Sequence, residues 1–148
     1  MRYNQIREMD ISNGPGVRVS IFMQGCHFHC KNCFNEATWD FNFGKAYTQE
    51  TEEYILDLLN HDYIAGLSIL GGEPFEFKNP MHPNNIEGTT KLAKAFKEEY
   101  PDKTIWVWSG YKFDKDLKDK DVLKYIDVLV DGTYKEELHN PTLKWKGS

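Results

Sequence analysis

The sequence predicts an α/β fold: an open, partial (β/α) barrel of parallel strands in which residues 1–148 form a single domain. Short runs of β-branched residues alternate with stretches of helical periodicity, and this alternation implies parallel strands joined by right-handed crossovers. The four or five such units are too few to close an eight-stranded barrel. A chain of 148 residues also has the usual size of one domain.

The first predicted unit is a strand over residues 17–23 and a helix over residues 48–60. The strand segment is rich in β-branched residues and follows a Gly-Pro-Gly turn. Arg18 in this strand either pairs with a carboxylate inside the barrel or faces outward. Thr48 is a good N-cap for the helix, and the glutamates of its first turn suit the positive end of the helix dipole.

The remaining elements continue the alternation. A short apolar run ends at two glycines, a second helical stretch stops before Pro101, and a strand rich in Trp and Val follows. A highly charged helical stretch and a last apolar run come after it. The sequence therefore predicts, in order, strand 67–70, helix 88–100, strand 104–108, helix 114–124 and strand 126–130.

Small or polar residues follow each predicted strand directly. Because the carboxyl ends of parallel strands meet at one edge, and α/β folds bind ligands at that edge, these residues predict a common site. The segments concerned are Gly25-Cys26, Gly71-Gly72-Glu73-Pro74, Ser109-Gly110-Tyr111 and Asp131-Gly132.

Composition excludes several classes of function. Hydrophobic residues make up 40% and charged residues 28% of the chain, as in globular proteins. No apolar run reaches the ~20 residues that span a bilayer, and the N-terminus lacks the apolar stretch of a signal peptide. We therefore expect a cytoplasmic protein without a membrane partner. The net charge of −5 argues against nonspecific binding to nucleic acid.

The three cysteines, Cys26, Cys30 and Cys33, have the spacing C-x3-C-x2-C. Their odd number and close spacing exclude a secreted disulfide framework. Three thiolates on one loop can hold three corners of a [4Fe-4S] cluster and leave the fourth iron open to another ligand. The alternatives are a Cys3His zinc site completed by His27 or His29, and CxxC redox chemistry, which leaves Cys26 unexplained.

The cysteine motif after the first strand, together with Gly71-Gly72-Glu73-Pro74 after the second, resembles the radical S-adenosylmethionine enzymes. The resemblance implies that the three cysteines ligate a [4Fe-4S] cluster and that the glycine-rich loop holds S-adenosylmethionine, with Glu73 facing its amino group. Many members carry an aromatic residue just before the third cysteine, whereas here Asn32 precedes it and Phe34 follows. The implied cofactor-binding residues are Asn32, Cys33, Phe34, Gly71, Gly72, Glu73 and Pro74.

Further segments narrow the resemblance to the activating proteins of anaerobic (class III) ribonucleotide reductases. They include residues 13–18, 105–112, 128–132 and 143–148. The resemblance implies reductive cleavage of S-adenosylmethionine to a 5′-deoxyadenosyl radical, a glycyl radical on the partner reductase, and a low-potential electron donor. The alternatives are an activase for a formate-lyase type of glycyl-radical enzyme and a non-catalytic zinc-binding module. Because such proteins usually continue with another short strand, the predicted domain allows for a missing C-terminal strand.

Overall fold

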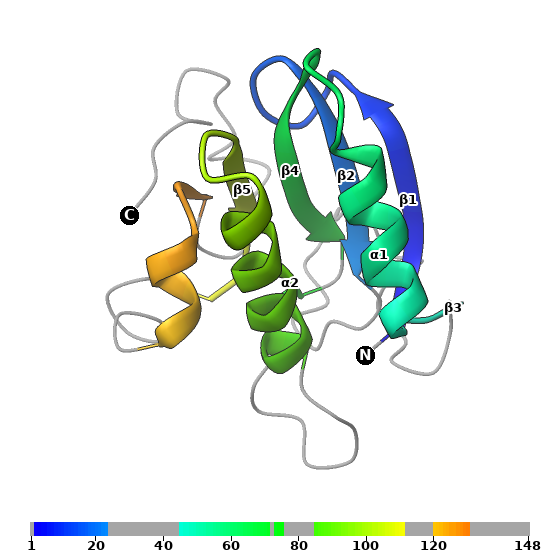
Figure 1. Cartoon of the computed structure of the whole chain (residues 1–148). Coiled ribbons are helices and arrows are strands. Elements are labelled where there is room, and N and C mark those ends of the chain that lie inside the picture. The colour runs from blue at the N-terminus through cyan, green and yellow to red at the C-terminus, as the bar shows by residue number, and fades with distance from the viewer. Residues whose placement is uncertain (1, 24–44, 72, 76–84, 112–119, 131–148) are drawn as a thin grey trace.

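A six-stranded sheet with two α-helices organises the chain (Figure 1). The computed structural model describes residues 2–23, 45–71, 73–75, 85–111 and 120–130. The strand order in the sheet is β3-β1-β2-β4-β5-β6. Along the chain the elements are β1 (Arg2–Asp10), β2 (Val17–Met23), β3 (Lys45–Ala46), α1 (Gln49–Leu58), β4 (Ile64–Gly71), α2 (Asn85–Glu99), β5 (Thr104–Trp108), the 3-10 helix η3 (Asp121–Tyr125) and β6 (Val128–Val130).

The predicted parallel strands are confirmed. β2 pairs in parallel with β4, β4 with β5, and β5 with β6. The predicted bounds of β2 and β5 match the structure, whereas β4 begins earlier than residue 67 and β6 begins later than residue 126. The register places Met23 of β2 opposite Gly71 of β4, so these two strands end side by side.

The prediction of an all-parallel sheet is wrong at one side, because β1 and β3 are antiparallel additions. β1 pairs antiparallel with β2, and β3 pairs antiparallel with the first residues of β1. β1 was not predicted because its sequence, RYNQIREMD, is mostly polar. A strand near the sheet edge tolerates this composition, since several of its side chains remain in solvent.

Two of the three predicted helices are present as α1 and α2. Thr48 caps α1 as expected: its hydroxyl accepts a hydrogen bond from the N–H of Thr51, and the Thr51 hydroxyl accepts one from the N–H of Thr48. α2 begins at Asn85, earlier than predicted. The predicted helix 114–124 falls largely outside the described residues, and its end belongs to η3. No described helix is both long enough and apolar enough to cross a lipid bilayer.

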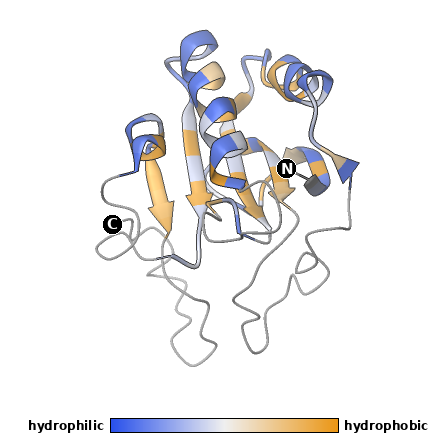
Figure 2. Cartoon of the chain, turned by 90° about the horizontal axis from the view of Figure 1, so that it is seen from below, coloured by the Kyte–Doolittle hydropathy of each residue, from blue (hydrophilic) through white to orange (hydrophobic). Residues whose placement is uncertain are grey.

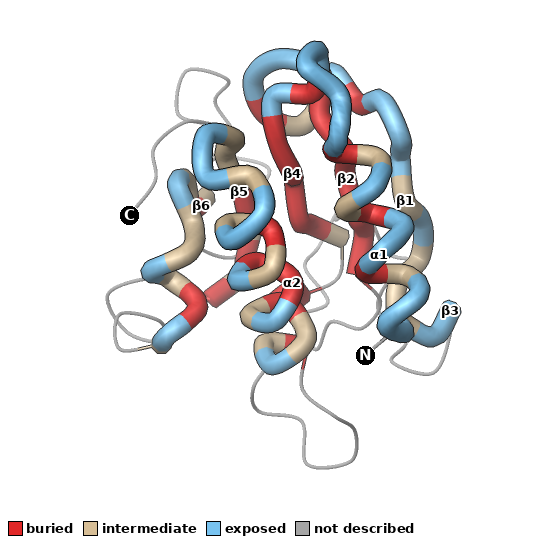
Figure 3. Tube along the Cα trace, viewed as in Figure 1, coloured by how far each residue is buried: buried red, intermediate tan, exposed pale blue. Residues whose placement is uncertain are grey.

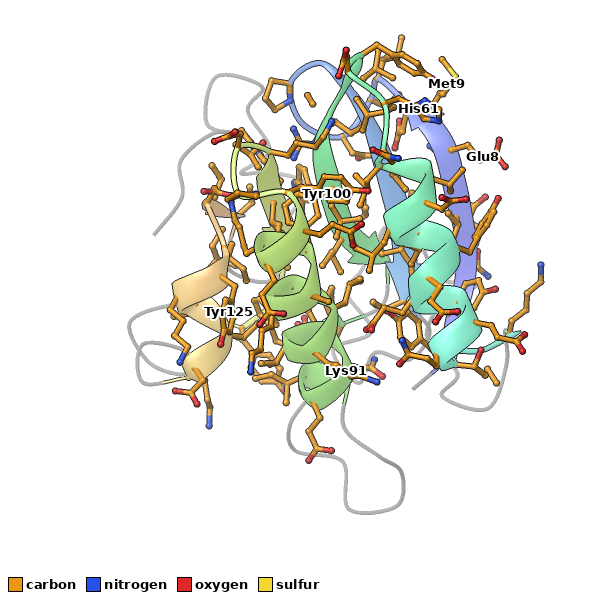
Figure 4. The ribbon with its side chains drawn as sticks, viewed as in Figure 1. Glu8, Met9, His61, Lys91, Tyr100 and Tyr125 are labelled. Carbon is orange, nitrogen blue, oxygen red and sulfur yellow. The ribbon has the colours of Figure 1, made fainter. Side chains whose placement is uncertain are left out.

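The main hydrophobic core lies between the sheet and the helices α1 and α2, which cover the same face (Figures 1 and 2). Buried residues concentrate along β2 and β4 (Figure 3). Tyr100 follows α2 and points toward α1 (Figure 4), where its hydroxyl donates to the Leu56 carbonyl at 2.6 Å. The core side chains include Val19, Ile21, Met23, Ile55, Leu59, Leu67, Ile69, Leu92, Phe96, Ile105 and Val107.

The opposite face of the sheet carries no described helix, yet its side chains are also buried. Because successive strand residues alternate between faces, Arg18 and Ser20 of β2 lie on this face, beside Ser68 of β4 and Trp106 of β5. This second face is therefore polar and aromatic, whereas the face toward the helices is aliphatic.

Candidate functional site

The carboxyl ends of the parallel strands β2, β4, β5 and β6 lie at one edge of the sheet, toward which the arrowheads of β2 and β4 point in Figure 1. β2 ends at Met23, three positions before Cys26. The loop after β5 joins β6 at this edge, because the N–H of Ser109 donates to the Val130 carbonyl at 2.9 Å. The cysteine segment and the glycine-rich loop therefore begin at adjacent strand ends, as the sequence predicts.

The predicted site residues divide into two groups. Gly71, Glu73 and Pro74 are described, and their contacts follow below. The others lie outside the described residues, so their roles stay predictions: Cys26, Cys30, Cys33, His27, His29, Asn32, Phe34 and Gly72.

Gly71 brings the glycine-rich loop against the end of β2. Its φ of +108° lies in the left-handed region that side chains disfavour. A Cβ at this position would stand 2.5 Å from the Met23 nitrogen and 2.7 Å from the Met23 oxygen. Only glycine fits both the backbone conformation and this approach, so the loop packs directly against the residue that leads to the cysteines.

The Glu73 carboxylate joins the loop after β4 to the loop after β5. Glu73 is 1% exposed. Its Oε2 accepts hydrogen bonds from the Ser109 hydroxyl at 2.7 Å and from the Phe75 N–H at 2.9 Å. Its Oε1 accepts from the Gly110 N–H at 2.7 Å. Hydrogen bonds to a carboxylate are about twice as strong as neutral ones, so this side chain fixes the two loops relative to each other.

Helix α2 holds the backbone of the same loop. The side-chain amide of Asn85 donates to the Glu73 carbonyl at 3.0 Å, and the Thr89 hydroxyl donates to the Pro74 carbonyl at 2.7 Å. Both side chains are buried. The sequence placed Ser109 in the predicted common site without a specific contact, and it did not single out Asn85 or Thr89. Only Ser109 carried a usable signal, since it directly follows a strand.

Comparison with known proteins gives consistent matches along the chain. Residues 12–148 match the family described as "4Fe-4S single cluster domain". A protein from Vibrio cholerae named "Anaerobic ribonucleoside-triphosphate reductase-activating protein" is 42% identical over 151 aligned positions, covering 100% of this chain and 94% of the relative. Proteins of the same name from Enterobacteria phage T4 and Escherichia coli K12 are each 40% identical, again over 100% of this chain and over 90% and 94% of their own lengths.

The chain belongs to the family of anaerobic ribonucleoside-triphosphate reductase-activating proteins. The matched region includes the cysteine segment and the glycine-rich loop. This confirms the family that the sequence motifs predict.

This member of the activating-protein family also carries a buried cation at the opposite end of the sheet. The Arg18 guanidinium donates to the Ser68 hydroxyl at 2.8 Å and to the carbonyls of Leu67 at 3.1 Å, Thr104 at 2.7 Å and Pro15 at 3.1 Å. The expectation that Arg18 faces outward is wrong, because the side chain is fully buried. Among the described residues its hydrogen-bond acceptors are carbonyls and a hydroxyl, and the expected pairing with a carboxylate is not found there.

Burial changes the electrostatics of Arg18. It lowers the pKa of the guanidinium to about 10, and the negative charge of Asp127 offsets part of the decrease. Gly66 makes room for the group, since a Cβ there would collide with the Thr104 carbonyl and lie 2.7 Å from Nη2 of Arg18. The arginine thus holds β2, β4 and β5 together at the end of the sheet opposite the cysteine edge. By the cysteine edge we mean the edge at the carboxyl ends of the parallel strands, where the cysteine segment begins.

Proposed function

We propose that the chain is an iron–sulfur activase of anaerobic ribonucleotide reductase. In this reaction S-adenosylmethionine accepts one electron, its C5′–S bond breaks, and methionine and a 5′-deoxyadenosyl radical form. The radical removes a hydrogen atom from a glycine Cα of the reductase and leaves a glycyl radical. The observation that carries the proposal is the roughly 40% identity, along the whole chain, to proteins named as activators of this reductase.

Cys26, Cys30 and Cys33 are proposed to hold the [4Fe-4S] cluster. The cluster would supply a low-potential electron, which an external donor must deliver. Two observations favour iron over the zinc alternative. The donor set is three thiolates on one segment, and the matching family is described by a single 4Fe-4S cluster.

S-adenosylmethionine is proposed to lie between two backbone segments at the same edge. One contains Asn32, Cys33 and Phe34, and the other comprises Gly71, Gly72, Glu73 and Pro74. The geometry of the second segment supports this assignment. Gly71 adopts a conformation that brings backbone, without a side chain, against the end of β2, and contacts from α2 fix the loop's carbonyls.

The sheet is further proposed to curve into an open partial (β/α) barrel. The parallel strands β2, β4, β5 and β6 support this, as do the described helices α1 and α2, which cover one face. The other face buries Arg18, Ser20, Ser68 and Trp106, a composition suited to a barrel interior. An open barrel would admit a glycine-bearing segment of the reductase.

The test is anaerobic reconstitution, followed by iron and sulfide analysis and incubation with reductant, S-adenosylmethionine and candidate partners. About four irons per chain and a glycyl doublet in the electron paramagnetic resonance spectrum of the reductase are expected. Stoichiometric zinc without iron would support the binding module instead. A doublet only on a formate-lyase type of enzyme would reassign the partner.

A further inference from the structure

We infer that Ser109 and Gly110, which follow β5, position the S-adenosylmethionine-binding loop through the carboxylate of Glu73. The inference rests on the proposed function, because it concerns the same cofactor loop. It assigns a positioning role to residues outside the cysteine and glycine motifs.

The loop after β5 is held in place by hydrogen bonds. Ser109 is 6% exposed, and its N–H donates to the Val130 carbonyl at the end of β6. Its hydroxyl accepts a hydrogen bond from the Tyr111 N–H at 3.1 Å while donating to Glu73. These bonds orient the hydroxyl toward the Glu73 carboxylate, so a neighbouring strand end determines where that carboxylate lies.

The glycine-rich loop is in turn fixed from two sides. Asn85 and Thr89 of α2 hold its carbonyls, while Ser109 and Gly110 hold the Glu73 side chain. Removal of the Ser109 hydroxyl would leave a buried carboxylate short of one donor, which is costly. The carboxylate would then move toward its remaining donors and carry its backbone with it. Binding sites tolerate displacements of only about 0.5 Å.

Ser68 provides a matched control. Like Ser109 it is a buried serine whose hydroxyl both donates and accepts: it donates to the Asn13 carbonyl at 2.7 Å and accepts from Arg18. Ser68, however, lies in the interior of β4 and contacts the Arg18 end of the sheet. Ser68→Ala and Ser109→Ala therefore remove the same atom from comparable surroundings, but only Ser109 contacts the cofactor loop.

The experiment uses cluster-loaded protein and measures S-adenosylmethionine affinity by anaerobic equilibrium dialysis, with the thermal unfolding midpoint measured in parallel. Ser109→Ala is expected to weaken binding about tenfold, the equivalent of about one lost buried hydrogen bond. Ser68→Ala should lower the unfolding midpoint at least as much and change affinity less than twofold. In a Glu73→Gln background, Ser109→Ala should add less than a further twofold loss, because both changes act on one contact.

The outcomes separate the positioning role from the proposed function. Wild-type protein that loads the cluster but does not bind S-adenosylmethionine would overturn both. Normal binding by the wild type, combined with unchanged affinity of Ser109→Ala, would overturn the positioning role alone. Equal losses in Ser68→Ala and Ser109→Ala, or additive losses in the double variant, would likewise show that Ser109 acts through general stability.

Discussion

Arg18 and Glu73 are buried charged side chains that link neighbouring strands at opposite ends of one sheet, with opposite hydrogen-bonding roles. Arg18 donates to carbonyls and to Ser68, whereas Glu73 accepts from amide groups and from Ser109. Most partners of Arg18 lie within strands, while the partners of Glu73 follow strands. The first arrangement therefore holds the sheet together, and the second aligns the loops of the site.

This difference implies that similar substitutions should have different consequences at the two ends. Changes near Arg18 should reduce the free energy of unfolding without altering the affinity of correctly folded molecules for S-adenosylmethionine. Changes near the cysteine edge should reduce cofactor binding beyond any loss of stability. The following predictions test this division, beginning with the largest expected effect.

Cys30→Ala should abolish iron binding, because a [4Fe-4S] cluster held by three thiolates loses a required corner. His29→Ala is the matched control and should retain its iron, since histidine is not needed to complete the three corners. Iron and sulfide analysis after anaerobic reconstitution measures both. Comparable iron loss in the two variants would restore the Cys3His zinc alternative.

Arg18→Met should lower the free energy of unfolding by about 3 kcal/mol, because the Ser68 hydroxyl and three carbonyls, of which that of Leu67 is buried, lose their donor. Urea denaturation gives the change, and dialysis with the folded, cluster-loaded variant should show cofactor affinity within about twofold of wild type. A loss of S-adenosylmethionine affinity at unchanged stability would contradict the proposed difference between the two ends of the sheet.

Gly71→Ala and Gly66→Ala form a pair of substitutions at the two ends of β4. Each should cost about 2 kcal/mol of stability. At Gly71 the cause is the φ of +108° and the approach to Met23, and at Gly66 it is the collision with Thr104. Only Gly71→Ala should also weaken S-adenosylmethionine binding. Equal cofactor affinities in the two variants, measured by dialysis, would contradict the special role of the cysteine edge.

Asp10→Asn should cost about 1 kcal/mol at pH 7. Burial raises the pKa of Asp10, but the hydrogen bonds from Asn13 and Ser12, the Ser20 hydroxyl and the charge of Arg7 together outweigh it, so the net pKa is lowered. A lowered carboxyl pKa stabilises the fold above the unfolded-state pKa, and this contribution is lost as the pH falls through the folded-state value. Urea titrations should therefore show the difference from wild type at pH 7 and its disappearance in strong acid. A difference that persists in acid would exclude the charge as its cause.

Ser20→Ala should change stability by less than about 0.5 kcal/mol. The Ser20 hydroxyl oxygen is fully buried and has no hydrogen-bond partner of good geometry among the described residues, although the hydroxyl contributes to lowering the pKa of Asp10. Ser68→Ala provides the contrast, since that hydroxyl bonds to Arg18 and Asn13. A large loss in Ser20→Ala, measured by thermal unfolding, would show that the interaction of Ser20 with Asp10 contributes to stability.

The sequence was informative where local pattern determines structure. The β-branched run of β2, the cap at Thr48 and the small residues after strands each have a local physical cause, and the elements they predict are present. β1 was missed because a strand near the edge of a sheet needs little apolar periodicity. The bond between Glu73 and Ser109 was missed for a different reason. It joins positions 36 apart in the sequence, and neither residue has a pattern that identifies its partner.

The contacts of Arg18 also bear on how the sheet forms. Its hydrogen bonds reach residues 50 and 86 positions away along the chain, and both distant partners arrive only after a helical crossover. Long loops must therefore close before the guanidinium can make all its hydrogen bonds, and the closure of long loops slows folding. A partly assembled sheet that buried the Arg18 cation without its full set of acceptors would have a higher free energy. The arginine thus makes assembly of β2, β4 and β5 cooperative, because intermediates that lack one of these strands are disfavoured.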